Sequence, residues 1–343
     1  MAVTIKDVAR AANVSVASVS RALNGHSNVT DETRKLVIET ARSLRYIPHS
    51  GARSLSTSRT DTIGVVLPDL YGEFFSELIR GIDVAARRRG LHLLVSSSHG
   101  DAAEAAVALR SMSGRVDGLI VMSPHVDASF LAENLPEVLP IVLLNTQVTG
   151  HAYSSLTVDN YGGAAAMVQH LVEMGHRRVM MIAGPENNFE AEERLRGYRE
   201  TLARLVPTFD PQDVTVLRGD FTEESGYRAG HQLQALKRLP DAVFAANDMM
   251  AIGCLFALNE AGLQVPRDIA LVGFDDIPTA RFITPPLTTV RVRMTDMGSR
   301  ALECLAFLIE NPEGTRNSVQ VLQTELVVRR SCGYPKLAGR VAV

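Results

Sequence analysis

The chain has 343 residues, of which 46% are hydrophobic and 21% charged, and its formal net charge is −3. These are ordinary values for a globular protein, and the length suits two or three compact units better than one. The sequence has no N-terminal apolar run typical of a signal sequence, and no stretch approaches the roughly 20 apolar residues that span a bilayer. We therefore expect a cytoplasmic protein without a membrane partner.

The charge is unevenly distributed along the chain. Residues 1–60 hold nine Lys or Arg and four Asp or Glu, whereas the remainder holds 26 basic and 34 acidic residues. A basic end on an acidic body indicates that only the N-terminal segment meets nucleic acid.

Residues 1–46 are predicted to form a small helical domain with three short helices between residues 4 and 45. Thr4 and Asp7 have the spacing of a capping box, and Ser15 and Thr30 can cap the second and third helices. A linker is expected at residues 47–60, where Leu55 is the only large apolar side chain after residue 48.

From residue 61 to residue 331 the pattern changes to short β-rich runs that alternate with helical ones. The expected strands are Thr62–Leu67, Leu91–Ser96, Gly118–Met122, Ile141–Asn145, Val179–Ala183, Val214–Leu217, Ala242–Ala246, Ile269–Gly273 and Thr289–Arg293. The expected helices include Phe74–Arg89, Gly163–Met174, Glu190–Val206, Glu223–Leu236 and Asp248–Ala261. This alternation predicts two parallel sheets covered by helices, with a ligand site in the cleft between two lobes. We expect a frayed tail at residues 332–343.

The second short helix has the character of a DNA-reading helix. Its outer face presents Val16, Ala17, Ser20 and Arg21. Small residues let such a helix lie deep in a major groove, where hydroxyls reach phosphates and Arg can bind guanine through two hydrogen bonds. A capped helix in a solvated bundle remains the alternative at this point.

The sequence closely resembles the LacI/GalR family of bacterial repressors over nearly its whole length, to about Ser331. In the N-terminal domain and linker the matching motifs are Thr4-Ile5-Lys6-Asp7-Val8-Ala9, Val14-Ser15, Val19-Ser20-Arg21, Val29, Thr33-Arg34, Tyr46-Ile47-Pro48 and Ala52-Arg53-Ser54-Leu55. In the core they are Ile63-Gly64-Val65, Val158-Asp159-Asn160, Gly175-His176, Gly184-Pro185, Asn247-Asp248, Gly273-Phe274-Asp275-Asp276 and Pro285-Pro286-Leu287-Thr288-Thr289.

This resemblance implies an all-α helix-turn-helix headpiece, a hinge, and an α/β core like the periplasmic binding proteins. The core would consist of two doubly wound lobes, and the chain would cross between them near residues 160, 291 and 323. The implied function is a transcriptional repressor, a homodimer on palindromic double-stranded operator DNA, which a small-molecule effector releases. The protein would work in the bacterial cytoplasm, on the nucleoid when bound to DNA.

The resemblance also implies which residues bind DNA. Val16, Ala17 and Arg21 match positions that read base edges, and Val16-Ala17 resembles the galactose-repressor type of reading pair, with an operator that has a central CG step. The positions that match phosphate contacts are Thr4, Ser15, Ser18, Ser20 and Asn24. In the linker, Leu55 matches a leucine that wedges into the minor groove, and Arg53 is a further expected contact. The alternatives are packing of Leu55 on its own domain and a solvated Arg53.

Seven residues match the family's effector positions, and together they suit a sugar. Arg194 and Asp275 correspond to a charged pair, Asn247 to an amide, Phe221 to an aromatic platform and Glu190 to an acceptor, while Phe74 and Phe75 lie at the lip of the first strand's loop. Charged and amide groups can satisfy sugar hydroxyls, and an aromatic face can cover C–H surface. The alternatives are a structural ion pair, a core Phe221 and an Asn247 that caps a helix. Asn188 and Glu190 replace an Arg and a Thr of the purine repressor, which disfavours a purine ligand.

Enzyme functions find no support in the sequence. It contains no Gly-x-Gly-x-x-Gly after a strand, no Walker loop, no Gly-x-Ser-x-Gly and no His-Glu-x-x-His. The three distant cysteines form no CxxC pair. We expect no catalytic residues, no cofactor and no metal. A corepressor-type regulator, whose ligand tightens DNA binding, and a non-regulatory sugar-binding module remain alternatives.

Overall fold

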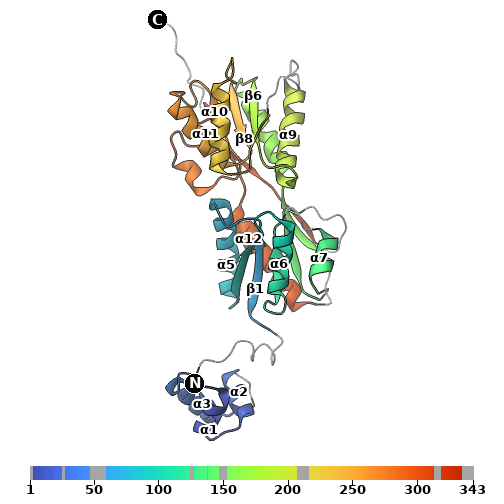
Figure 1. Cartoon of the computed structure of the whole chain (residues 1–343), viewed down its shortest axis with the longest axis vertical. Coiled ribbons are helices and arrows are strands. Elements are labelled where there is room, and N and C mark those ends of the chain that lie inside the picture. Colours follow the sequence, from blue (N-terminus) through green and yellow to red (C-terminus); the bar gives the residue numbers. More distant parts are fainter. Residues whose placement is uncertain are drawn as a thin grey trace. The chain divides into compact units, whose positions relative to one another are not determined.

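The computed structural model describes residues 3–24, 28–46, 59–123, 127–136, 138–146, 153–206, 216–312 and 318–333. The chain divides into two compact units (Figure 1): Met1–Thr62 with Arg115–Asp117, and Ile63–Gly114 with Gly118–Val343. Among the described residues, no helix combines the length and apolar character needed to cross a membrane.

The first unit contains the three expected helices, α1 (Ile5–Ala11), α2 (Val16–Leu23) and α3 (Asp31–Ser43). Each begins directly after the residue expected to cap it. The Asp7 carboxylate accepts from the backbone N–H of Thr4 at 2.9 Å, and the hydroxyls of Ser15 and Thr30 accept from the backbone N–H three residues on. The buried side chains between the helices are Val8, Ala9, Ala12, Val19, Ala22, Val37 and Ala41.

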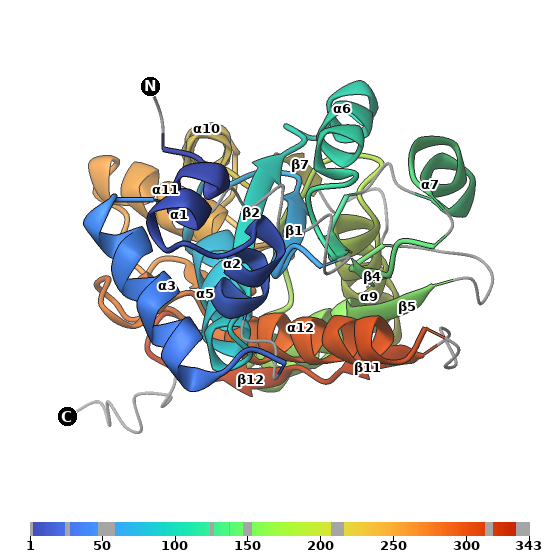
Figure 2. The ribbon, with the colours of Figure 1, turned by 90° about the horizontal axis from the view of Figure 1, so that it is seen from below.

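The first lobe of the second unit has a six-stranded sheet in the order β11-β5-β4-β3-β1-β2. Its strands are β1 (Thr62–Leu67), β2 (His92–Ser97), β3 (Gly118–Val121), β4 (Ile141–Leu144), β5 (Ser154–Val158) and β11 (Val319–Leu322), and its helices are α5 (Glu73–Arg88), α6 (Ala102–Met112), α7 (Ala128–Asn134) and α12 (Met294–Glu310). The pairs from β1 through β3, β4 and β5 to β11 are parallel. Figure 2 shows α6 and α7 on the opposite side of the strands from α12, which packs against α5.

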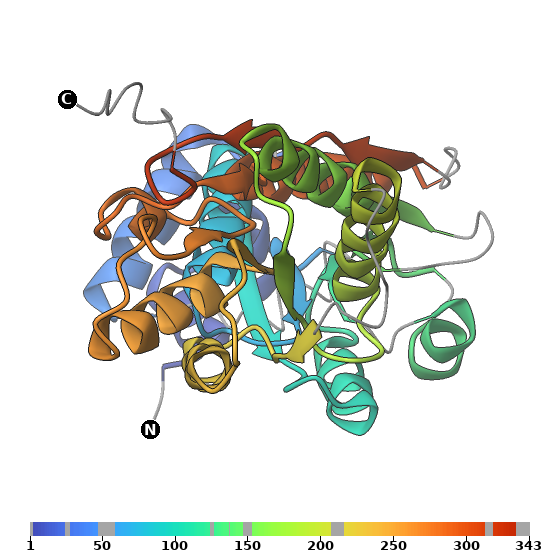
Figure 3. The ribbon, with the colours of Figure 1, turned by 90° about the horizontal axis from the view of Figure 1, so that it is seen from above.

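The second lobe has a four-stranded parallel sheet in the order β7-β6-β8-β9. Its strands are β6 (Val179–Ala183), β7 (Val216–Arg218), β8 (Ala242–Ala245) and β9 (Ala270–Val272), and its helices are α8 (Asn160–Glu173), α9 (Phe189–Leu205), α10 (Glu223–Gln234), α11 (Asp248–Glu260) and the 3-10 turn η1 (Pro278–Arg281). Figure 3 shows the pair α8 and α9, in green, apart from the pair α10 and α11, in yellow to orange, and the members of each pair pack together.

The chain crosses between the lobes three times, where the resemblance implied. The first crossing runs from β5 into α8 at Asn160, and the second runs from β10 (Thr289–Arg291) into α12. The third runs from β11 into β12 (Glu325–Val327), which pairs antiparallel with β10. The two doubly wound lobes are thereby confirmed.

Seven of the described elements were not assigned from the sequence: the strands β5, β11 and β12, the helices α6, α7 and α12, and the 3-10 turn η1. The two C-terminal strands are only four and three residues long, and the burial of β11 alternates between exposed and intermediate, as expected at a sheet edge. The expected start of the tail at residue 332 is wrong, because Cys332 is buried and its Sγ lies 3.2 Å from Thr288 Oγ1. The rest of the expected tail, residues 334–343, lies outside the described residues.

Candidate functional site

The exposed face of α2 carries the residues expected to read base edges. Val16, Ala17 and Arg21 are exposed, whereas Val19 and Ala22 on the opposite face are buried. Small side chains at the start of a helix let its backbone approach a groove closely, and Arg can donate two hydrogen bonds to guanine. The face required for reading DNA is therefore present, and its contact with bases stays a prediction.

The residues expected at phosphates lie within α2 (Ser18 and Ser20), at its two ends (Ser15 and Asn24) and at the start of α1 (Thr4). Some of their polar groups already serve as caps, since the Thr4 hydroxyl donates to Asp7 and the Ser15 hydroxyl accepts from the backbone N–H of Ser18. Each hydroxyl oxygen keeps further hydrogen-bonding capacity for a phosphate. The two expected linker contacts, Arg53 and Leu55, lie outside the described residues.

A cleft of about 570 Å³ lies between the two lobes of the second unit. All seven residues expected to bind the effector line it: Phe74, Phe75, Glu190, Arg194, Phe221, Asn247 and Asp275. Most of them follow the carboxyl ends of strands, where ligands bind in open α/β sheets, because the loops there converge on one edge. The sequence therefore predicted which side chains meet, and their contact with a ligand stays a prediction.

Arg194 lies at the centre of the second lobe's side of the cleft and is almost completely buried. Its Nε donates to Asn160 Oδ1 at 2.8 Å, and its Nη1 donates to the carbonyl oxygen of Ala246 at 2.6 Å. The guanidinium carbon lies 3.8 Å from the centre of the Phe274 ring, in cation–π geometry. These contacts hold the guanidinium against the floor of the cleft and leave little of it for a ligand.

Asp275 is a buried carboxylate with incomplete compensation. Its Oδ1 lies 3.3 Å from Arg194 Nη2, yet no described residue donates a well-aligned hydrogen bond to that oxygen. Burial raises the pKa of Asp275 to about 7, because it disfavours the charge more strongly than Arg194 favours it, and nearby Glu190 adds to the effect. Its backbone φ of 112° is strained for a residue with a side chain. An unsatisfied acceptor in a strained turn is typical of a ligand-binding position.

Glu190 is the second buried carboxylate of the cleft. It lies in the first turn of α9 and accepts a short hydrogen bond from the side-chain amide of Asn145 in the first lobe. Burial raises the pKa of Glu190, against the opposing effects of Arg194 and Asn145. The contact joins the two lobes inside the cleft. Sequence reasoning missed Asn145, although it follows β4 directly, as the other site residues follow their strands.

The aromatic side chains line the cleft from both lobes. Phe74 and Phe75 meet edge to face, with ring centres 5.3 Å apart. Phe221 is half-buried and lies above Gly184, where an added Cβ would come within 2.6 Å of its ring. Because Gly184 has no side chain, the ring of Phe221 can lie against its backbone. The half-exposed ring surfaces are suited to cover the C–H surface of a ligand.

Asn247 caps α11, which is one of the roles that the sequence left open. Its Oδ1 accepts from the backbone N–H of Met250 at 2.9 Å, and its Nδ2 donates to the carbonyl oxygen of Phe221 at 2.9 Å. The amide therefore holds the platform residue in place. One N–H and one lone pair remain, so a ligand contact stays a prediction.

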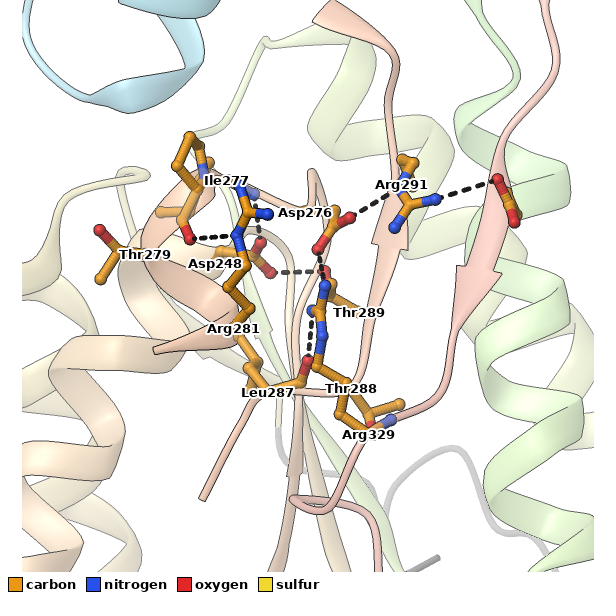
Figure 4. A network of polar contacts seen from close by, with 12 residues as sticks. Asp248, Asp276, Ile277, Thr279, Arg281, Leu287, Thr288, Thr289, Arg291 and Arg329 are labelled. Atoms are coloured by element: carbon orange, nitrogen blue, oxygen red, sulfur yellow. Dashed lines mark hydrogen bonds and ion pairs between the residues drawn. The ribbon is translucent and has the colours of Figure 1, made fainter. Parts of the chain in front are cut away.

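The turn that carries Asp276 and Ile277 is tied to the crossover strands, as Figure 4 shows. Asp248 accepts from the backbone N–H of Ile277 at 2.9 Å and from the hydroxyl of Thr289 at 2.5 Å. Asp276 accepts from Arg291 Nε at 2.7 Å and from Arg329 Nη2 at 2.6 Å (Figure 4). Adjacent carboxylates thus serve different regions: Asp275 faces the cleft, and Asp276 binds the strand through which the chain crosses between lobes.

The described residues contain no group of three or more His, Cys, Asp or Glu side chains with the arrangement of a metal site. The cleft's polar groups are instead carboxylates, amides, hydroxyls, one guanidinium and one imidazole beside aromatic rings. That combination can bind a polar organic molecule.

Comparison with known proteins connects both sites to one family. The model for "Bacterial regulatory proteins, lacI family" matches residues 4–49, and the model for "Periplasmic binding protein-like domain" matches residues 168–332. The HTH-type transcriptional repressor CytR of Escherichia coli (strain K12) is 36% identical over 336 residues, which are 96% of each chain. Catabolite control protein A of Priestia megaterium is 34% identical, over 96% of this chain and 99% of that protein.

Two solved structures of transcriptional regulators are similar to this chain over nearly its whole length. The lac repressor dimer bound to operator and the anti-inducer ONPF has a TM-score of 0.84 at 29% identity, covering 97% of this chain and 99% of that one. The complex of the transcriptional regulator CelR with cellobiose has a TM-score of 0.71 at 33% identity, covering 96% and 99%. The relatives are transcriptional regulators and not enzymes, and this chain is likewise a DNA-binding repressor with a ligand-binding core. The chain belongs to the lacI family of bacterial regulatory proteins.

Proposed function

We propose that this repressor acts in the cytoplasm as a homodimer on a palindromic operator and that a sugar effector in the interlobe cleft releases it from DNA. The observation that carries the proposal is the conjunction, in one chain, of an exposed small-residue reading helix and a cleft with two buried carboxylates beside aromatic rings. Carboxylates accept from hydroxyls, and rings cover C–H surface. The CelR relative is a cellobiose complex, which supports a sugar.

The coupling between effector and DNA has a structural candidate. An effector that binds Asp275 would act on the adjacent residue Asp276. One ion-pair partner of Asp276 is Arg291, the last residue of the crossover strand β10. Typical coupling of about 1–3 kcal/mol changes operator affinity roughly 5–150-fold. The sign of the change separates release from corepression: weaker operator binding at saturating effector supports our proposal, and tighter binding supports the corepressor alternative.

Operator binding and the linker wedge are tested together. We expect the wild type to bind a palindromic operator with a central CG step in a gel-shift titration. The Leu55→Gly variant should bind this operator more weakly and keep its effector affinity. An apolar side chain inserted between base pairs compensates for the free energy that kinking the DNA costs, and glycine cannot supply that contact. Ser58→Gly in the same linker is the matched control for backbone flexibility. Equal operator affinities of wild type and Leu55→Gly would contradict the wedge.

The free protein is expected to be a dimer rather than a tetramer. Phe256 and Phe282 on the second lobe are 59% and 76% exposed, which is unusual for large aromatic side chains and suits an interface. Sedimentation at micromolar concentration should therefore show a dimer.

The interface is tested by Phe282→Asp, which should raise the monomer fraction, because a charge would replace an apolar contact. Val138→Asp, at an equally exposed position of the first lobe, should leave the dimer intact. A stable tetramer of the wild type, or a dimer unaffected by Phe282→Asp, would refute the respective part of the prediction.

A further inference from the structure

The ionisable side chains that line the effector cleft are mostly acidic. Five carboxylates line it, from Asp69, Glu186, Glu190, Asp220 and Asp275, against one guanidinium and one imidazole, from Arg194 and His99. Arg218 and Arg228, which do not line the cleft, pair with Glu186 and Asp220, so the acidic excess rests on the other three carboxyl groups. An excess of one sign of charge favours ligands of the opposite sign.

The imbalance is greatest at the buried end of the cleft. Glu190 and Asp275 are both buried there, and Arg194 is the guanidinium that compensates them. Two of its nitrogen atoms already donate to Asn160 and Ala246. Asp275 Oδ1 receives no well-aligned hydrogen bond from any described residue. The floor of the cleft therefore holds two carboxyl groups against one guanidinium, whose donors are mostly engaged.

At the N-termini of three helices that begin at the cleft, side chains of the protein itself already accept hydrogen bonds from the backbone N–H groups. A helix N-terminus is a common phosphate site, because its first N–H groups have no partner within the helix. Here the cleft residues Asn188, Thr222 and Asn247 cap α9, α10 and α11 with their own side chains. The first turns of these helices also contain acidic residues. An anionic ligand would have to displace a cap and approach a carboxylate.

The fourth helix that begins at the cleft is α5. Its N-cap, Gly72, has no side chain, and Glu73 lies in its first turn. The Glu73 carboxylate accepts from the backbone N–H of Thr279 at 2.8 Å and also from the Thr279 hydroxyl. This end therefore carries a fixed negative charge where a phosphate would need donors.

We propose that the effector carries neither phosphate nor carboxylate, and that an amino group in place of a hydroxyl strengthens its binding by donating to Glu190 and Asp275. The inference deepens the proposed function, since it concerns the same cleft and rests on a sugar-class ligand. A protonated amine supplies both the donors and the positive charge that the cleft floor lacks. A phosphate ester would bring a further anion to a place where burial already disfavours the charge of two carboxyl groups, so it would be repelled by either group once ionised.

The experiment compares matched sets of sugars in thermal-shift and calorimetric titrations of the full-length protein. The sets are glucose, glucosamine, glucose 6-phosphate and glucuronate, with the corresponding galactose set, and ribose with ribose 5-phosphate. For each parent sugar that binds, the phosphate ester and the uronate should bind at least roughly tenfold more weakly, a difference of about 1.4 kcal/mol. The amino sugar should bind more tightly than its parent.

Two variants locate the preference. Glu190→Gln should lose the advantage of the amino sugar over its parent. Glu192→Gln is the matched control: it is exposed on the same helix, removes the same charge and does not line the cleft. It should keep the advantage, so any change common to both variants would indicate a general effect of charge.

The outcomes separate the inference from the proposed function. A phosphate ester or uronate that binds as tightly as its parent overturns the inference and leaves a sugar-released repressor intact, as does an equal loss of preference in both variants. If no sugar in the sets binds, both the inference and the sugar effector are contradicted, while operator binding is judged independently by gel shift.

Discussion

Asp275→Asn is expected to give a repressor that binds operator normally and no longer responds to its effector. The carboxylate is buried in the cleft, and its Oδ1 lacks a well-aligned donor among the described residues. Ligand donors would therefore find an acceptor there. Asparagine keeps the shape but loses the charge and one acceptor, and unpaired polar groups of this kind cost about 1–3 kcal/mol. That loss equals the typical allosteric coupling, so the response should fail at ordinary effector concentrations.

The pH dependence of unfolding distinguishes a ligand role from a structural one. The pKa of Asp275 is raised to about 7, so its neutral form is favoured in the folded state. The stability it contributes is full below its unfolded pKa and is lost as pH rises through about 7. Without effector, the melting temperature of Asp275→Asn should therefore rise relative to wild type as pH increases from 5 to 8.

A structural ion pair predicts the opposite result. If Arg194 depended on the Asp275 charge for its position, the variant would melt lower than wild type, and the deficit would grow as pH rises through about 7 and the carboxylate ionises. Three measurements on the variant distinguish the two roles of Asp275. They are its melting temperature without ligand, its operator affinity, and the change in that affinity when the sugar is added that changes the operator affinity of wild type most. Normal release from operator would reject the assignment.

Most of the fold followed from local pattern, because strands and helices that alternate along a chain leave few arrangements. The run Ile63–Leu67 reads as a buried strand and is one. The strand β5 was missed since its first two residues are serines, which are buried in a strand that lies between β4 and β11. β11 lies 164 residues further along, counting from Ser155 to its partner Val319. A pairing of such sequence separation is set by tertiary structure, which no local window contains.

In the candidate site, too, some features could be predicted from the sequence and others depend on tertiary structure. Asp275 and Phe221 were predicted from the resemblance, and the strand-end rule applies to both. Their positive φ values of 112° and 71°, and the cap that Asn247 forms, depend on the packing of neighbouring loops. Asn145 belongs to the other lobe and meets Glu190 only when the lobes face each other. Residue types at strand ends can be read from sequence, whereas the pairing between them cannot.

Arg194→Met is expected to destabilise the core more than any other single change in the cleft. Methionine keeps the length of the side chain and removes every donor. The carbonyl of Ala246 and the side chain of Asn160 would lose their partner, and Asp275 would remain buried without a countercharge. Breaking a buried pair in this way costs about 3–5 kcal/mol. Arg196→Met on the same helix is the control, since its side chain is 49% exposed and its ion pairs contribute about 0.2–1 kcal/mol.

The double variant Arg194→Met with Asp275→Asn tests where that cost comes from. If the uncompensated carboxylate is its main source, removing the charge of Asp275 should restore part of the stability, with a coupling of about 0.5–3 kcal/mol in denaturant unfolding. Strict additivity would place the cost in the lost contacts to Ala246 and Asn160 instead. Those contacts join the end of β8 to the first residue of α8, at the crossing from the first lobe. Arg194 would then act mainly as the structural tie between the crossing and the cleft floor, and Asp275 would be free to serve the ligand.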